Sequence, residues 1–256
     1  MYQSNQWDGL SSDDVGFIHT KNSHGYMVRQ PDELTHAFVS FARGHDQPCV
    51  DVGAAYGVAS LYAIEQGVKD VIAIDPEQAH LDYIEQQFNS MAKASDQTIE
   101  YHCGYFPKTI TVDKHPVSAM LMARVLHFMR GSDITQLLNQ AFHLLMPGGK
   151  LFISTSSPYV NLLLDYIDTY EQQERLGLVE WPGEIEDLTQ YLPASDQQQN
   201  QIFGHVLTPK VLSAHLEKAG FKIVRAEYST RPYQAIAQMT DERYAGKEDT
   251  VIVAVK

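Results

Sequence analysis

The stretch Asp51-Val-Gly-Ala-Ala-Tyr-Gly57 decides the fold, because it joins an apolar strand to a helix through small residues. The strand is Pro48-Cys-Val-Asp-Val-Gly53 and the helix is Val58-Ala-Ser-Leu-Tyr-Ala-Ile-Glu-Gln66. The two glycines of the turn permit a tight bend and close approach of a ligand, and the two alanines between them keep the surface low. Ligands of open α/β sheets bind beyond the carboxyl ends of the strands, so the turn predicts a binding site.

Strands and helices alternate outward from this turn in both directions. Asp70-Val-Ile-Ala-Ile-Asp75, for example, has four consecutive apolar residues, which is typical of a buried parallel strand. The alternation predicts an α/β fold with a doubly wound, mostly parallel, seven-stranded Rossmann-like sheet. No helix separates the last two strands, so we expect them to pair antiparallel at one edge. The predicted strands are 48–53, 70–75, 98–103, 117–123, 150–154, 221–228 and 250–255, and the predicted helices are 31–42, 58–66, 76–94, 133–146 and 208–220.

Residues 156–206 differ in amino-acid composition from the segments on both sides. They include nine acidic residues and one basic residue, a charge of −8, whereas the rest of the chain carries −5. They also include six aromatic residues. We interpret 156–206 as a helical lid insertion, because loops past the fifth strand lie above the carboxyl edge of the sheet; a solvated acidic surface is the plainer interpretation. The remaining divisions are an N-terminal cap segment, 1–30, and the main domain, 31–256.

Composition narrows the classes of partner. The net charge of −13 opposes binding to nucleic acid, and a small or neutral partner fits better. No apolar run reaches the length of a membrane span, and no secretory signal is visible at the start. Two cysteines suit a reducing compartment, so we expect a cytoplasmic protein, as a monomer or a homodimer. The histidines have no metal-ligand spacing, and we assign no metal.

Two acidic residues suggest the chemistry of the ligand. Asp51 lies two residues before the first glycine of the turn, where it would repel a pyrophosphate but suit an ammonium group. Asp75 ends the second strand, where an acid can accept hydrogen bonds from both ribose hydroxyls, and Pro76 offers an apolar surface to a nucleobase. The third glycine of the nicotinamide fingerprint is replaced by Val58. The implied ligand is a nucleoside with a cationic amino-acid tail and no phosphate.

The sequence at this point resembles the class I S-adenosylmethionine-dependent methyltransferases, over about residues 31–155 and 207–256. Asp51–Gly57 is similar to the acid-x-Gly-x-Gly-x-Gly turn of that family, with Ala55 at the middle glycine. Leu145-Met-Pro-Gly-Gly-Lys-Leu-Phe-Ile153 resembles its Leu-x-Pro-Gly-Gly segment, and the helix and Ala-Gly-Phe turn that end at Phe221 resemble those of its small-molecule members. The resemblance implies S-adenosyl-L-methionine as cofactor, with the turn holding the methionine portion and Asp75 the ribose.

The sequence departs from the family pattern at two places. The turn after the third strand lacks the acid that often bonds the adenine, and the segment after the fourth strand lacks the Asn/Asp-Pro-Pro-Tyr motif of nucleic-acid base methyltransferases. His127, which follows that fourth strand, is the candidate catalytic base. The predicted cofactor-binding residues are Tyr26, Arg29, Asp51, Gly53, Ala54, Ala55, Gly57, Asp75, Pro76, Gly104, Tyr105, Phe106, Ala123 and Arg124.

Each of these residues also has a structural interpretation. His127 is equally typical of a structural histidine, Asp75 of a helix cap, Arg124 of a bond to a loop carbonyl, and Arg29 of an exposed ion pair. We predict a methyltransferase that acts on a small-molecule acceptor. The alternatives are a non-catalytic nucleoside-binding regulatory or partner subunit, a nicotinamide-dependent oxidoreductase, and an RNA- or protein-methylating enzyme.

Overall fold

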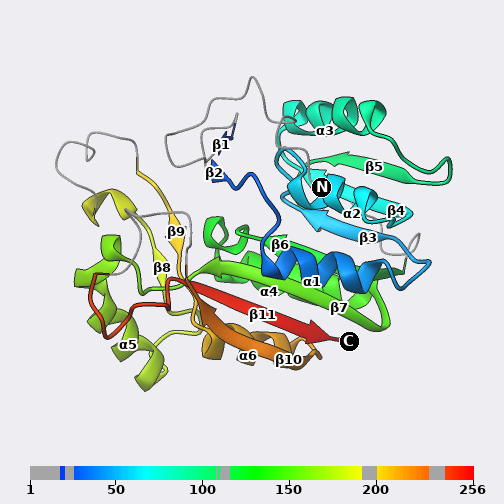
Figure 1. Ribbon diagram of the computed structural model, residues 1–256. Coiled ribbons are helices and arrows are strands. Elements are labelled where there is room, and N and C mark those ends of the chain that lie inside the picture. Colours follow the sequence, from blue (N-terminus) through cyan, green and yellow to red (C-terminus); the bar gives the residue numbers. More distant parts are fainter. Residues whose placement is uncertain (1–17, 21–25, 108, 110–115, 192–200, 231–239) are drawn as a thin grey trace. The chain divides into compact units, whose positions relative to one another are not determined.

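The computed structural model describes residues 18–20, 26–107, 109, 116–191, 201–230 and 240–256 (Figure 1). Seven strands hydrogen-bond in the order β10-β11-β7-β6-β3-β4-β5, and two short pairs, β1-β2 and β8-β9, stand apart from that sheet. The pairs β3·β4, β3·β6 and β4·β5 are parallel, and β10 pairs antiparallel with β11 at one edge. The predicted α/β sheet with its antiparallel edge pair is therefore confirmed.

The elements follow the predicted alternation, with shifts of a few residues at their ends. The strands are β1 (Ile18–His19), β2 (Tyr26–Met27), β3 (Cys49–Val52), β4 (Asp70–Asp75), β5 (Thr98–Cys103), β6 (Val117–Ala123), β7 (Leu145–Ser156), β8 (Glu184–Ile185), β9 (Gly204–His205), β10 (Lys222–Ser229) and β11 (Asp249–Val255). The helices are α1 (Glu33–Ala42), α2 (Val58–Glu65), α3 (Gln78–Ser90), α4 (Gly131–Leu144), α5 (Ile167–Leu176) and α6 (Pro209–Lys218), with 3₁₀ turns η3 (Leu126–Phe128), η4 (Asn161–Tyr166) and η5 (Leu188–Tyr191).

The chain divides into two compact units. The first comprises residues up to Met122 with Gln140–Phe152 and Lys256, and the second comprises Ala123–Asn139 and Ile153–Val255. In the first unit all four residues of β3 are buried, as expected for a strand with parallel neighbours on both sides. Helices α2 and α3 pack on β4, and α1 packs on α2.

The boundary between α4 and β7 differs from the prediction. Pro147-Gly-Gly149 was expected to close the helix as a turn before a strand at Lys150, but β7 begins at Leu145. The backbone explains the difference: the Gly148 N–H donates to the carbonyl of Lys256 at 3.1 Å, and the Lys256 N–H donates to the carbonyl of Gly149 at 3.0 Å. These bonds to the last residue keep the segment in the hydrogen-bonded ladder.

The second unit contains α6 on the β10·β11 pair and the whole of the 156–206 segment. Helix α6 begins as the sequence predicts: Thr208 is the N-cap and accepts a hydrogen bond from the Val211 N–H at 3.3 Å, with Pro209 at the first helical position. Residues 156–206 form η4, α5, β8, η5 and β9. They are helical in part, as expected.

The aromatic side chains of 156–206 belong to the packing of that segment. Tyr166 and Tyr170 are buried with Val160, Leu163, Ile185 and Val206 in one apolar cluster, and the buried Trp181 ring stacks on His215 at 3.5 Å between ring centroids. Packing thus accounts for part of the aromatic composition that favoured a lid in the sequence, within the segment for Tyr166 and Tyr170 and against α6 for Trp181. The lid function stays a prediction, and most of the cap segment 1–30 lies outside the described residues.

Candidate functional site

The turn after β3 has the backbone that its small residues permit. Gly53 and Gly57 have φ of 73° and 80°, and Ala55 between them has φ of 46°, so three residues of the turn lie in the left-handed region. Gly57 has a second reason to be glycine, because a Cβ there would lie 2.7 Å from Cγ1 of Ile84. The Gly53 and Ala54 N–H groups both donate to the carbonyl of Ile74, which fixes the turn against β4. The result is a low, rigid surface at the carboxyl end of β3.

Asp51 lies beneath this turn with its carboxyl group buried. Its side chain accepts a hydrogen bond from the Ser60 hydroxyl at 2.7 Å, and only 3% of the residue is exposed. Burial raises the pKa of Asp51 to about 6; the Ser60 hydrogen bond opposes that shift and the charge of Asp75 adds to it. A buried carboxylate with a raised pKa gains most from a nearby positive charge. The binding of an ammonium group beside Asp51 stays a prediction.

Asp75, at the end of β4, uses most of its acceptor capacity within the protein. One oxygen accepts from the Ala55 N–H at 2.8 Å, and the other accepts from the Glu77 N–H and lies 2.9 Å from Nδ1 of His80. A carboxylate has about four acceptor positions, so about one remains for a ligand. The role of Asp75 in binding ribose hydroxyls stays a prediction, and its carboxylate would share its oxygens between the ligand and these three donors.

His80 is a residue of this site that the sequence reasoning missed. It is 1% exposed, contacts Asp75, and packs edge-on against the Tyr56 ring at 4.7 Å between centroids. Its position five residues after Asp75, on the first turn of α3, is a signal that helical spacing could have provided. Because one oxygen of Asp75 is held by His80 and the other by Ala55, the carboxylate ties the glycine turn to the start of α3.

The turn after β5 lies next in the same unit. The Gly104 N–H donates to the Asp75 carbonyl at 3.0 Å, and a Cβ on Gly104 would collide with the side chain of Thr109. Phe106 is 5% exposed, so it is a packing residue, whereas Tyr105 is 70% exposed. Thus Tyr105 is the accessible aromatic side chain of this turn. Of the two aromatic residues of this turn that were predicted to bind cofactor, Tyr105 is the one whose side chain a ligand can reach.

Exposure also distinguishes the residues around the end of β4. Pro76 is exposed, as a stacking surface requires, and its carbonyl accepts a hydrogen bond from the Cys103 thiol at 3.6 Å. Cys103 is exposed, whereas Cys49 on β3 is buried, and both are free thiols. Arg29 is half-buried, and for Tyr26 only the backbone, in β2, is described.

The residues after β6 belong to the second unit. Ala123 ends the strand, and Arg124 has a φ of 59°, an unusual value for a residue with a long side chain. Its N–H donates to the Ser154 carbonyl at 2.8 Å, and its guanidinium lies 2.6 Å from a carboxylate oxygen of Asp249. The side chain of Asp249 is 3% exposed, so Arg124 neutralises a buried charge. The guanidinium predicted to bind cofactor is therefore engaged in an ion pair.

His127 lies in η3, three residues beyond Arg124. It is half-buried, and its ring centroid lies 4.0 Å from that of Phe128, which is 49% exposed. Leu126, between Arg124 and His127, is fully buried and anchors the turn. The Arg124–Asp249 ion pair and the buried Leu126 together hold the segment that carries His127, the candidate base.

The described residues include no group of three or more His, Cys, Asp or Glu side chains suited to a metal ion. Among the described helices, none combines the length and apolarity required to cross a bilayer.

Comparison with known proteins identifies relatives of this arrangement. Residues 24–226 match the family described as "Methyltransferase domain". No curated protein matches the chain by sequence. Among solved structures, an S-adenosylmethionine-dependent methyltransferase from Methanosarcina mazei superposes with a TM-score of 0.59 at 17% identity, over 89% of this chain and 98% of that one.

Two further structures contain ligands. The 1,6-didemethyltoxoflavin-N1-methyltransferase of Burkholderia thailandensis, with bound 1,6-didemethyltoxoflavin and S-adenosylhomocysteine, superposes with a TM-score of 0.52 at 17% identity, over 88% of this chain and 78% of that one. The glycopeptide N-methyltransferase MtfA, complexed with S-adenosylmethionine, superposes with a TM-score of 0.56 at 12% identity, over 86% of this chain and 92% of that one.

Proposed function

The chain belongs to the class I S-adenosylmethionine-dependent methyltransferases, and we propose that it transfers the methyl group to a small-molecule acceptor. S-adenosylmethionine supplies a methyl carbon already activated by sulfonium. The observation that supports the assignment of the site is the pairing of two buried carboxylates, Asp51 and Asp75, on the two sides of the left-handed turn. One carboxylate suits an ammonium group and the other suits a hydroxyl.

The residues of this chain would divide the work as follows. Asp51 balances the ammonium group, the N–H groups of the turn and the remaining acceptor position of Asp75 bind polar atoms, and Pro76 with Tyr105 supplies surfaces for the nucleobase. His127 takes the proton of the acceptor as the methyl group is transferred. Since transfer is an in-line displacement, holding the acceptor in line contributes most of the rate enhancement.

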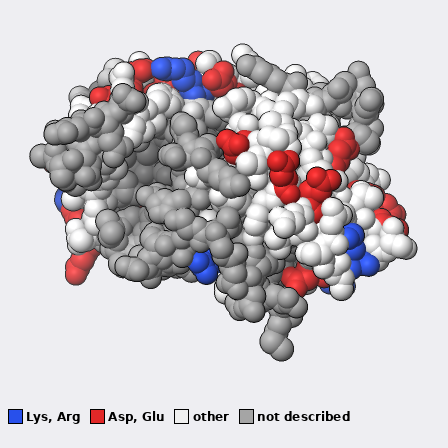
Figure 2. All heavy atoms as spheres, turned by 90° about the horizontal axis from the view of Figure 1, so that it is seen from above, with Lys and Arg blue, Asp and Glu red and all other residues white. Residues whose placement is uncertain are grey.

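Charge supports a small acceptor over a nucleic acid. The net charge is −13, and the face in Figure 2 shows several groups of acidic side chains and few basic ones among the described residues. A nucleic-acid substrate requires a basic surface for its phosphates. Two free cysteines further suit a reducing compartment, and we place the protein in the cytoplasm.

Calorimetry and a transfer assay test the proposal. We expect S-adenosylhomocysteine to bind to the purified protein with one site per chain, and labelled methyl groups to appear on a member of a metabolite panel, with transfer abolished or strongly slowed in His127→Ala. Binding of the cofactor product without transfer to any small molecule, together with transfer to RNA or protein, would refute the small-molecule assignment. Absence of binding at millimolar ligand would refute the site itself.

A further inference from the structure

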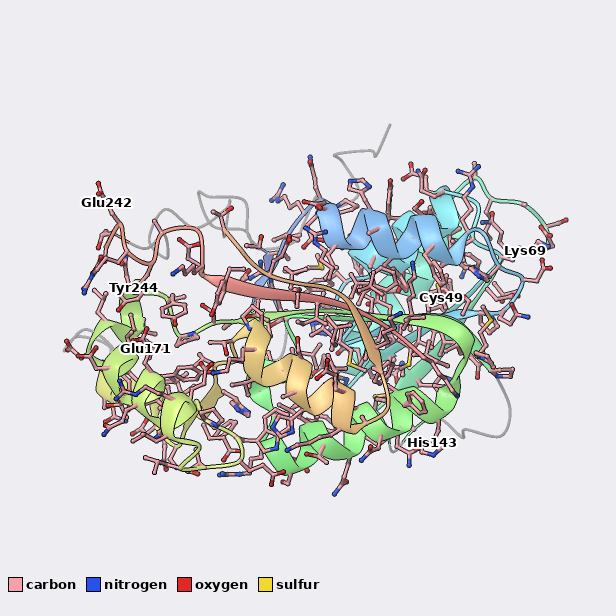
Figure 3. The ribbon with its side chains drawn as sticks, turned by 90° about the horizontal axis from the view of Figure 1, so that it is seen from below. Cys49, Lys69, His143, Glu171, Glu242 and Tyr244 are labelled. Carbon is pink, nitrogen blue, oxygen red and sulfur yellow. The ribbon has the colours of Figure 1, made fainter. Side chains whose placement is uncertain are left out.

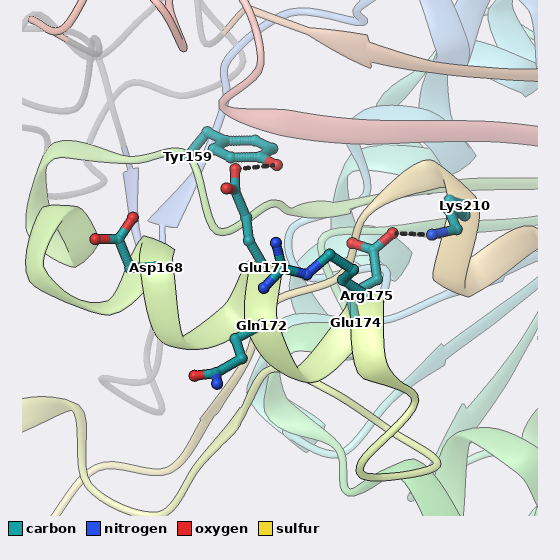
Figure 4. A pocket seen from close by; sticks show the side chains of 7 residues that line it. All are labelled: Tyr159, Asp168, Glu171, Gln172, Glu174, Arg175 and Lys210. Carbon is teal, nitrogen blue, oxygen red and sulfur yellow. Dashed lines mark hydrogen bonds and ion pairs between the residues drawn. The ribbon is translucent and has the colours of Figure 1, made fainter.

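A cavity of about 570 Å³ lies in the second unit, and none of its lining residues is assigned to the cofactor above. One face of α5 forms its floor, and Tyr159 and Lys210 border it (Figure 4). Its volume is within the range of small-molecule sites. The lining residues are Tyr159, Asp168, Glu171, Gln172, Glu174, Arg175 and Lys210.

Only two of the five charged side chains that line this cavity form an ion pair with one another. Glu174 is neutralised: one oxygen lies 3.1 Å from Nζ of Lys210, and the other accepts from the Thr208 hydroxyl at 3.2 Å. Among the described residues, Glu171 accepts a hydrogen bond only from the neutral hydroxyl of Tyr159, at 3.2 Å. Neither Asp168 nor Arg175 has an ion-pair partner within the part of the chain that the structure describes. The charge of Asp168 acts on the guanidinium of Arg243, so Glu171 and Arg175 are the exposed charges that a ligand would meet without an ion pair in the described part of the chain.

These charges are separated along the helix. Asp168 lies in the first turn of α5 and Arg175 in the last, with Glu171 between them. At about 1.5 Å per residue, Arg175 is about 6 Å along the axis from Glu171 and about 10 Å from Asp168. The acidic end of the cavity is thus at the start of α5, and Figure 4 shows the Arg175 guanidinium, which comes from the last turn, directed back toward Glu171.

The acidic end borders tyrosine rings that already hold an ammonium group. Nζ of Lys247 lies 5.4 Å, 6.0 Å and 5.7 Å from the ring centroids of Tyr159, Tyr228 and Tyr244, and the Tyr159 and Tyr244 rings stack at 4.9 Å. Figure 3 labels Tyr244 and Glu171, which both contact Tyr159. Ring faces attract cations within about 6 Å of the centroid. The geometry of Lys247 shows that this aromatic cluster, of which Tyr159 also borders the cavity, accommodates a positive charge.

We propose that the cavity binds a bipolar small molecule, an amine that also carries an acidic group. Its ammonium group contacts Glu171, and its carboxylate or phosphate contacts Arg175; the Tyr159 ring already holds the ammonium group of Lys247. A doubly cationic ligand is disfavoured because its second charge would face Arg175. The site lies within the second unit, and its occupation requires neither cofactor nor methyl transfer.

The placement of these charges also complements the helix dipole, with an acid in the first turn and a base in the last. That role predicts changes in helix stability on substitution and no ligand binding. The two roles are separated by measuring thermal unfolding and ligand binding on the same variants.

Calorimetry with 6-aminohexanoate, hexylamine and hexanoate, in low salt at pH 7.5 and without cofactor, tests the inference. All three compounds have a six-carbon chain: 6-aminohexanoate carries an ammonium group and a carboxylate, hexylamine only the ammonium group, and hexanoate only the carboxylate. We expect 6-aminohexanoate to bind saturably at millimolar concentrations and at least fivefold more tightly than either half. Glu171→Gln should weaken the two amines about fivefold or more and leave hexanoate unchanged, since a charged hydrogen bond is lost. Arg175→Gln should weaken the two acids and leave hexylamine unchanged.

Glu217→Gln is the matched control, since Glu217 is an exposed glutamate on the neighbouring helix α6 and does not line the cavity. It should leave the affinity for all three compounds unchanged. The inference is overturned if no compound binds saturably to the wild-type protein, or if Glu171→Gln and Glu217→Gln have equal effects. A protein that fails this test while it binds S-adenosylhomocysteine and transfers methyl groups retains the proposed function.

Discussion

Replacing Asp51 by asparagine should stabilise the ligand-free protein and weaken its affinity for the cofactor at the same time. The carboxyl group is buried, and its pKa is raised from 3.8 to about 6, chiefly by burial. A shift of about 2 pKa units corresponds to about 3 kcal/mol. Because the pKa is raised in the folded state, the stabilising contribution of the protonated form is complete below about pH 4 and is lost as the pH rises through 6. Asparagine never ionises, and its amide oxygen still accepts from the Ser60 hydroxyl.

The free energy of unfolding, measured by urea denaturation, should therefore respond to pH differently in the two proteins. We expect the advantage of Asp51→Asn over the wild type to be about 2 kcal/mol larger at pH 8 than at pH 4.5. Asp46→Asn is the matched control, since the Asp46 side chain is 89% exposed and only pairs with Lys69 on the surface. An advantage of Asp51→Asn that does not change with pH would refute the electrostatic explanation.

Affinity for S-adenosylhomocysteine should change in the opposite direction. Loss of the carboxylate opposite an ammonium group costs about 1.5–3 kcal/mol, or about 10- to 100-fold in Kd at pH 8. The wild-type affinity should itself fall below pH 6, as Asp51 takes up a proton, whereas the affinity of the variant should stay flat. A variant that is more stable and binds equally well would place the ammonium group elsewhere.

Three further substitutions test other parts of the structure. Asp75→Ala leaves the buried donors around the carboxylate without an acceptor, so calorimetry should show S-adenosylhomocysteine binding weakened by about 1–3 kcal/mol; unchanged affinity would contradict the role of Asp75. Gly57→Ala should lower the free energy of unfolding by about 1–3 kcal/mol in the wild-type protein and by less in an Ile84→Ala background, which lacks the Cγ1 atom that the new Cβ would meet; an equal loss in both backgrounds would contradict the steric explanation. Asp249→Asn removes the charged partner of Arg124 and should lower the free energy of unfolding, measured by urea denaturation, by about 1–2 kcal/mol. The same substitution should change kcat more than KM, and a change in KM alone would contradict a role in holding the segment that carries His127.

Sequence alone predicted the sheet because its signals are local. Apolar runs such as that ending at Asp75, the glycine turn after β3 and the Thr208-Pro209 cap each depend on a few neighbouring residues, and each is present in the structure. The start of β7 was wrong because it depends on Lys256, more than a hundred residues away in the chain.

The site was predictable to a smaller extent for the same reason. The sequence identified Asp75 as an acceptor but not the backbone and His80 donors that already occupy it. Arg124 was predicted to bind cofactor, and only folding brings it beside Asp249. Composition identified the aromatic residues of 156–206 but does not distinguish those of a local core, such as Tyr166 and Tyr170, from those that face a ligand, so the lid stays a prediction.

The contrast between the two cysteines offers a way to observe the cofactor site. Burial raises the pKa of the Cys49 thiol well above its ordinary value, so that thiol is inert, whereas Cys103 is exposed and contacts the carbonyl of Pro76. A maleimide dye should consequently label one position per molecule, beside the carboxyl end of β4. Its emission would report the arrival of a nucleoside in real time, without radioactivity and without any engineered residue.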